Sequence, residues 1–87
     1  MEFIYEPERI YMKNEDEKVV AEVTFPENNG IANINHTYVD GSLRGQGIAG
    51  KLVKAAADQI IKDGNGITAT CSYAVKWFSK HPEYKLN

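Results

Sequence analysis

A glycine-rich turn constrains this chain most: residues 43–51 (LRGQGIAGK), between an apolar, β-like segment and the longest amphipathic segment. Three glycines within six residues let the backbone approach a ligand closely. A helix that begins here would present unpaired N–H groups and its positive dipole end to an anion. Arg44 adds a positive charge beside the turn. The turn therefore predicts a phosphate-binding site, and the alternative is a glycine-rich start of a helix that binds no ligand.

Length and composition predict one compact domain over residues 1–87, because 43% hydrophobic residues supply a core of the size that such a chain needs. A single cysteine excludes an internal disulfide. One cysteine and two histidines are also too few for a typical structural zinc site, which uses four such ligands. A net charge of -2 argues against nucleic-acid and anionic-membrane partners. The N-terminus shows no apolar signal-like run, so we expect a cytoplasmic protein.

The first half of the chain predicts strands. Residues 3–13 read as short strands interrupted at Pro7, and residues 18–25 alternate in polarity, so 9–25 predicts an antiparallel hairpin. A turn follows over 26–30. Residues 31–39 predict one further strand that leads into the glycine turn. Its expected faces are Ile34, His36 and Tyr38 on one side, and Asn33, Asn35, Thr37 and Val39 on the other.

The second half predicts helix, strand and helix. Apolar residues recur every three or four positions from Ile48 to about Lys62, which predicts an amphipathic helix that ends at the glycines of 63–66. Residues 67–71 predict a short strand parallel to the predicted strand over 31–39, and a second helix is predicted from Ser72 to about Lys80. The fold class is α/β, in the α+β sense: an antiparallel sheet of three or four strands, a helix, a short parallel strand and a second helix.

Two nucleotide-binding motifs match the glycines only in part. Gly45-x-Gly47-x-x-Gly50 fits the dinucleotide fingerprint, but the place where that fold needs an acid holds Thr70-Cys71-Ser72. Gly45-x-x-x-x-Gly50-Lys51 resembles a P-loop, but Leu52 replaces the hydroxyl that should hold magnesium. Nucleotide hydrolysis and dinucleotide binding are therefore both rejected.

A third pattern, Arg44-x-x-Gly47-x-Ala49 between an antiparallel meander and a helix, resembles motif A of the GNAT acetyltransferase superfamily. Downstream, Ala74, Val75 and Trp77 fit the family's pattern, and His36-Thr37-x-Val39 with the ending at 81–84 resembles its small YjdJ-type branch. The resemblance covers roughly residues 18–84 and implies a minimal GNAT-like fold. It also implies binding of acetyl-coenzyme A, with coenzyme A as the product.

The resemblance assigns a cofactor-binding role to the end of the predicted strand over 31–39 and to the glycine turn. Backbone amides of the turn would hold the pyrophosphate, and the preceding strand would hydrogen-bond the pantetheine arm. The residues concerned are Tyr38, Val39, Leu43, Arg44, Gly45, Gln46, Gly47, Ile48, Ala49 and Gly50.

Two side chains are candidate catalytic groups. His36 lies on the strand where family members commonly carry a general base, although a hydrogen-bonded core histidine is the alternative. Cys71 would end the parallel strand at the start of a helix, where amides favour a thiolate, although buried free cysteines often serve as apolar filler. In a catalytic role, Cys71 would carry the acetyl group transiently or act as the acid.

The chain departs from the family pattern at two places. Phe78 stands where many members have the tyrosine that protonates the leaving thiolate, and only residues 14–17 stand where larger members place two helices, so the acceptor side should be open. Two functions follow: N-acetyl transfer to an unidentified amine, with proteins among the candidate acceptors, or a non-catalytic module that binds or senses coenzyme A. The open acceptor side and Phe78 favour the module, and Cys71 favours the enzyme.

Overall fold

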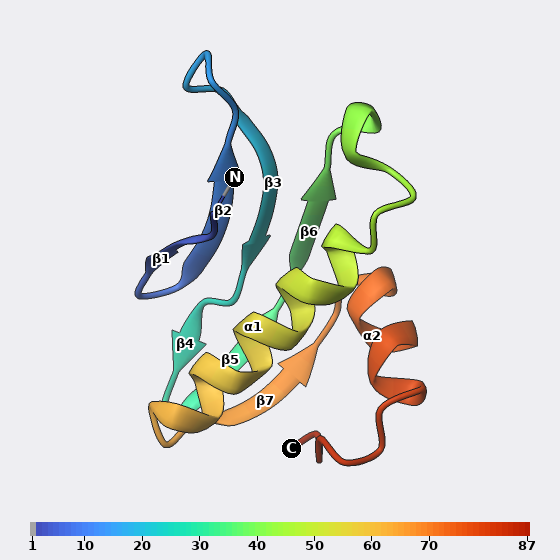
Figure 1. The fold of residues 1–87 in the computed structure, drawn as a ribbon. Helices are drawn as coiled ribbons and strands as arrows, with labels where there is room; N and C mark the ends of the chain where they lie inside the picture. The colour runs from blue at the N-terminus through green and yellow to red at the C-terminus, as the bar shows by residue number, and fades with distance from the viewer. Residues whose placement is uncertain (1) are drawn as a thin grey trace.

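The computed structural model describes residues 2–87, in which two small sheets lie edge to edge beneath a long helix (Figure 1). The first sheet is four-stranded and antiparallel, in the order β1-β2-β3-β6. Its strands are β1 (Ile4–Glu6), β2 (Arg9–Lys13), β3 (Val19–Thr24) and β6 (His36–Val39). The predicted hairpin over 9–25 is confirmed as β2 and β3, which pair antiparallel with Ile10 opposite Val23.

The second sheet is three-stranded, in the order β4-β5-β7. Its strands are β4 (Glu27–Asn28), β5 (Ile31–Ile34) and β7 (Gly66–Ala69). β4 and β5 form a tight antiparallel pair at the predicted turn, and β5 and β7 are parallel, with Ile34 opposite Ala69. The parallel pairing predicted from the crossover helix is therefore confirmed.

The prediction of one continuous strand over 31–39 is wrong, because the chain breaks at Asn35 and changes sheets. Asn35 donates its N–H to the Thr24 carbonyl at 3.2 Å, while His36 is the register partner of Thr24, so two residues oppose one. This extra residue inverts the alternation of side chains. Ile34 is fully buried, whereas His36 and Tyr38 are exposed, so the three side chains do not share a face as predicted.

The helices are η1 (Gly41–Leu43), α1 (Ile48–Lys62) and α2 (Ser72–Ser79). α1 lies across one face of both sheets (Figure 1). Its apolar stripe packs onto them. The stripe and the sheets share one core, in which the largest fully buried side chains are Ile10, Val23, Phe25, Ile34, Leu52, Val53 and Ile60. Burial of such side chains, worth roughly 1.5–3 kcal/mol each, fixes α1 against both sheets.

Glycine ends α1 as predicted. Gly64 adopts a φ of 79° and donates its N–H to the Ile61 carbonyl at 2.9 Å, so the last turn closes before the chain enters β7. α2 follows β7 and packs Ala74 and Phe78 into the core. The resulting order places the end of β6, the start of α1 and the start of α2 at one end of the molecule (Figure 1).

Candidate functional site

The loop between β6 and α1 is built by one acid and two glycines. Asp40 accepts hydrogen bonds from the Ser42 N–H at 3.0 Å and the Ser42 hydroxyl at 2.6 Å, which cap η1 and hold the pKa of Asp40 below its usual value. Gly45 and Gly47 have φ angles of 83° and 70°. Both lie in the left-handed region that favours glycine, so these residues bend the loop back toward the core at low strain.

The loop delivers an uncapped helix end. Gly47 is the N-cap of α1, and no side chain within residues 2–87 makes a cap hydrogen bond there. The N–H groups of the first turn have no partner inside the helix, and no acid lies in that turn to offset the positive dipole end. With the exposed Arg44 nearby, this end of α1 is suited to an anion.

A cavity of about 310 Å³ opens at this helix end. It is lined by Val39 from β6, by Tyr73 from α2, and by Leu43, Arg44, Gly45, Gly47, Ile48 and Ala49. The structure thus brings seven of the predicted cofactor-binding residues around one space and adds a side chain from α2. A larger depression of about 560 Å³ lies between the side of α1 and Tyr5 of β1, away from the start of the helix, and three exposed lysines, Lys51, Lys54 and Lys62, line it.

Three predicted binding residues, Tyr38, Gln46 and Gly50, lie outside the cavity lining. Gly50 is inside α1, and a Cβ added there would be 3.3 Å from Trp77 Nε1 and 3.4 Å from the Tyr73 hydroxyl. Its lack of a side chain therefore permits the close approach of α2. Gln46 is exposed on the loop. Of the three predicted glycines, two shape the loop and the third packs two helices together.

β6 offers its free edge to the cavity, because it is the outer strand of its sheet. The Asp40 N–H donates to the Val20 carbonyl at 2.7 Å, so even-numbered residues of β6 direct their backbone groups toward β3. Tyr38 belongs to this set, and its hydroxyl donates to Asp40 at 3.2 Å. The backbone N–H and C=O of Thr37 and Val39 point to the free edge instead.

Cys71 lies where the two sheets separate. The N–H groups of Thr70 and Cys71 both donate to the Ile34 carbonyl, at 3.1 and 3.2 Å, and the Cys71 thiol lies 3.5 Å from the Thr37 hydroxyl. Burial by itself raises the pKa of the Cys71 thiol, but the Thr37 hydroxyl and backbone amides of α2 and β6 favour the thiolate more strongly. The pKa of this half-buried thiol is consequently lowered.

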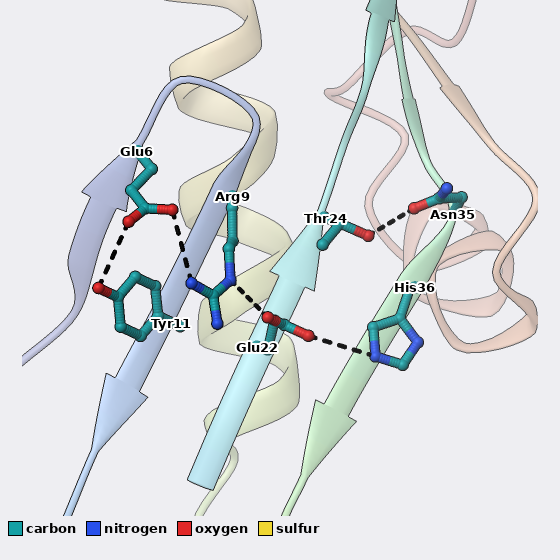
Figure 2. A network of polar contacts seen from close by, with 7 residues as sticks. All are labelled: Glu6, Arg9, Tyr11, Glu22, Thr24, Asn35 and His36. Atoms are coloured by element: carbon teal, nitrogen blue, oxygen red, sulfur yellow. Dashed lines mark hydrogen bonds and ion pairs between the residues drawn. The ribbon is translucent and has the colours of Figure 1, made fainter. Parts of the chain in front are cut away.

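His36 lies on the other face of β6. Its side chain is 54% exposed, and its Nε2 is 3.6 Å from Oε1 of Glu22 on β3 (Figure 2). Thr37 faces Cys71, and side chains alternate along a strand, so the structure does not bring His36 and Cys71 together. Sequence reasoning missed Glu22 and Thr37. The alternation along β6 is the signal for Thr37, but no sequence signal pairs Glu22 with His36.

Comparison with known proteins places this geometry in a family. A family model described as GCN5-related N-acetyl-transferase matches residues 9–86. The proteins named NATD1 from Gallus gallus and Mus musculus are 36% identical over 52 residues, which cover 60% of this chain and 47% of theirs. The match thus spans just under half the length of these curated relatives.

Solved structures share the fold. A GCN5-like protein from Staphylococcus aureus is 31% identical, with a TM-score of 0.77 over 95% of this chain and 82% of that one. Tetrahymena GCN5, at 16% identity and a TM-score of 0.65 over 83% of this chain and 48% of its own, shares the fold alone. Within residues 2–87, no helix has the length and apolar character needed to cross a membrane.

Proposed function

Because the chain belongs to the GCN5-related N-acetyltransferase family, we propose that it binds acetyl-coenzyme A and transfers the acetyl group to an amine. The observation that carries the proposal is the uncapped start of α1, which opens on the cavity beside the free edge of β6. Bound acetyl-coenzyme A would supply a pyrophosphate anion and a reactive thioester. The pyrophosphate fits the start of α1, because the first-turn amides carry partial positive charge and Arg44 carries a full positive charge.

The neighbouring edge of β6 fits an extended arm. Thr37 and Val39 direct N–H and C=O groups away from β3. The Thr37 N–H faces the Cys71 thiol, so Val39 is the residue with which an amide-containing ligand could pair as a further strand would. Val39 also lines the cavity. A ligand anchored at the start of α1 and running along this edge toward Thr37 would bring its reactive end near Cys71.

Two side chains are proposed for proton transfer. His36 accepts the proton of the acceptor amine, and Cys71 donates a proton to the leaving thiolate or carries the acetyl group transiently. Phe78 cannot take the donor role, since it is a buried hydrocarbon ring packed edge-on against Trp77. We propose a cytoplasmic location, where a single free thiol remains reduced, and an acceptor that is not a nucleic acid or membrane lipid.

A second candidate is a non-catalytic module that binds or senses coenzyme A. The specific observation in its favour is the separation of the candidate groups: Cys71 faces Thr37, and His36 lies on the opposite face of β6. In this case the loop and the free edge of β6 would serve binding alone.

One experiment separates the two. The chain is incubated with acetyl-coenzyme A and a primary alkylamine, and thiol release and the acetylated amine are followed by mass spectrometry. The enzyme predicts amide product, with a roughly hundredfold lower rate for His36→Gln, since general-base catalysis contributes about 10²–10⁴-fold. A +42 Da adduct confined to Cys71, and lost when amine is added, supports the acyl-carrier role. Tight binding with neither product nor adduct supports the module and contradicts the enzyme.

A further inference from the structure

The exposed face of the four-stranded sheet carries a connected polar network that crosses all four strands (Figure 2). Its members are Glu6 on β1, Arg9 and Tyr11 on β2, Glu22 on β3 and His36 on β6. We propose that Glu22 is a positioning residue that orients the His36 imidazole for proton acceptance. This inference rests on the proposed acetyl transfer and names the group that would make His36 an effective base.

Glu22 divides its carboxylate between two partners. Oε2 accepts a hydrogen bond from Arg9 Nε, and Oε1 faces His36 Nε2 at 3.6 Å. The Glu22 side chain is 22% exposed, against 54% for His36, so the carboxylate is the more shielded member of the pair. It lies on a central strand between two hydrogen-bonded neighbours, where the sheet fixes its Cα position.

Arg9 is itself fixed, which makes Glu22 a rigid partner. Its guanidinium lies 3.5 Å from the Glu6 carboxylate and stacks over the Tyr11 ring at 3.9 Å from the ring centroid. A guanidinium held on three sides has little freedom to reorient the carboxylate that it binds. The network therefore transmits the geometry of β1 and β2 to the imidazole on β6.

The contact with Glu22 selects the working nitrogen of His36. A carboxylate beside Nε2 favours the tautomer with its proton on Nε2, and this leaves the lone pair on Nδ1. As the acceptor nitrogen attacks the thioester, a C–N bond forms and the C–S bond breaks. The amine proton passes to Nδ1, and Glu22 faces the imidazolium that results. The coenzyme A thiolate takes its proton from Cys71 or from water.

His36 is well placed for this role, because it is the first residue of β6 and directly follows Asn35, where the sheets separate. Thr37, the next residue, contacts Cys71 from the other face. An acceptor that approaches the exposed sheet face would thus meet the free edge of β6 beside His36. The other ionisable groups on this face of β6 are Tyr38 and Asp40, which are hydrogen-bonded to each other.

A double-mutant cycle on the full chain tests this role. Glu22→Gln, His36→Gln and the double variant are assayed with acetyl-coenzyme A and a primary alkylamine, and thermal unfolding verifies that each variant is folded. The control is Glu15→Gln, which removes the same charge from an exposed turn. Arg9→Gln is a second probe, because it frees the Glu22 carboxylate without altering either member of the pair.

We expect Glu22→Gln to lower kcat about tenfold while KM for acetyl-coenzyme A stays within about twofold, the pattern of a group that acts on the reaction and not on binding. In the His36→Gln background the same change should alter kcat by less than about twofold. Arg9→Gln should lower kcat by a smaller factor, and this effect should also disappear in the His36→Gln background. Glu15→Gln should leave kcat unchanged.

If Glu22→Gln lowers kcat by the same factor in the unmodified chain and in the His36→Gln background, Glu22 does not act through His36, and the positioning role is overturned. The proposal of acetyl transfer is unaffected by that result. Full activity of Glu22→Gln has the same meaning. Absence of any amide product from the unmodified chain, by contrast, refutes the proposed function, and the role of Glu22 falls with it. The two failures are therefore distinct in the same set of assays.

Discussion

Replacement of Gly47 by alanine isolates the loop conformation on which the proposed phosphate site depends. Gly47 has a φ of 70°, and an added Cβ would have no atom within 4 Å, so the change introduces backbone strain without a clash. An L-residue in the left-handed region costs roughly 1–2 kcal/mol, and alanine recovers about 0.4–1 kcal/mol by restricting the unfolded chain. The net destabilisation should be about 1 kcal/mol, which lowers Tm by about 4–8 °C in a domain of this size.

Gly64→Ala is the matched control. Gly64 has a φ of 79°, again with nothing within 4 Å of an added Cβ, and it lies at the opposite end of α1. Its effect on thermal stability should equal that of Gly47→Ala. Only Gly47→Ala should weaken coenzyme A binding, by about tenfold, because relief of the strain at the N-cap moves the amides that hold the anion, and tenfold is the worth of about one hydrogen bond to a charge.

The assay pairs differential scanning calorimetry with titration calorimetry against coenzyme A on the unmodified chain and both variants. If Gly64→Ala weakens binding as much as Gly47→Ala, strain anywhere in α1 explains the loss of affinity, and a specific role of the Gly47 conformation in anion binding is excluded. A Gly47→Ala variant with a lower Tm and an unchanged affinity for coenzyme A would exclude that role as well.

Three further predictions follow from particular contacts. Thr37→Val removes the hydroxyl that favours the Cys71 thiolate, so the pKa of the Cys71 thiol should rise. Alkylation of Cys71 by iodoacetamide should therefore be slower in the variant at neutral pH. The two alkylation rates should become equal at a pH high enough to ionise Cys71 in both the variant and the unmodified chain. Leu52→Ala, at a fully buried position of α1, should cost about 2–5 kcal/mol in urea unfolding, a large share of the roughly 4–13 kcal/mol expected for the chain. Tyr84→Phe removes a 2.6 Å hydrogen bond that holds the pKa of Asp58 below its usual value. At neutral pH the free energy of unfolding should fall by about 0.5–1 kcal/mol, and this difference should fade as acid protonates Asp58. A difference in unfolding free energy that stays constant down to low pH would contradict the role of this hydrogen bond.

Local patterns were sufficient for most elements of the fold. The spacing of apolar residues from Ile48 onward predicted α1, and Gly64 ended it as expected, because both signals act within one or two helical turns. The hairpin of β2 and β3 followed in the same way from alternation. The crossover between β5 and β7 could be inferred because a helix separates them.

The break at Asn35 could not be inferred. Residues on both sides of it favour strand, and one extra residue leaves no mark in composition, yet it moves His36 and Tyr38 to the face opposite the core. The face of a strand depends on the parity of position, so an error of one residue inverts every side chain beyond it. This break places the Thr37 side chain against Cys71 and the His36 side chain on the opposite face of β6.

The candidate site was predictable where it depends on one segment and unpredictable where distant strands meet. The loop from Leu43 to Ala49 and the neighbouring Val39 do surround one cavity. Gly50 belongs to the same motif, but its packing against Trp77 depends on where α2 lies. Glu22 comes near His36 only through the register of β3 and β6, which the sequence does not specify residue by residue.

The most direct test of the central claim is a titration of the ¹⁵N-labelled chain with coenzyme A, followed through its amide chemical shifts. We expect the amides of residues 44–50 and of Thr37 and Val39 to shift together and saturate, while those of residues 64–66 at the far end of α1 stay in place. Unmoved amides at 44–50 under saturating ligand would contradict the proposed binding site. Shifts confined to the surface of α1 around Lys54 and Asp58 would contradict this binding site as well, because they would place the ligand in the depression between α1 and Tyr5.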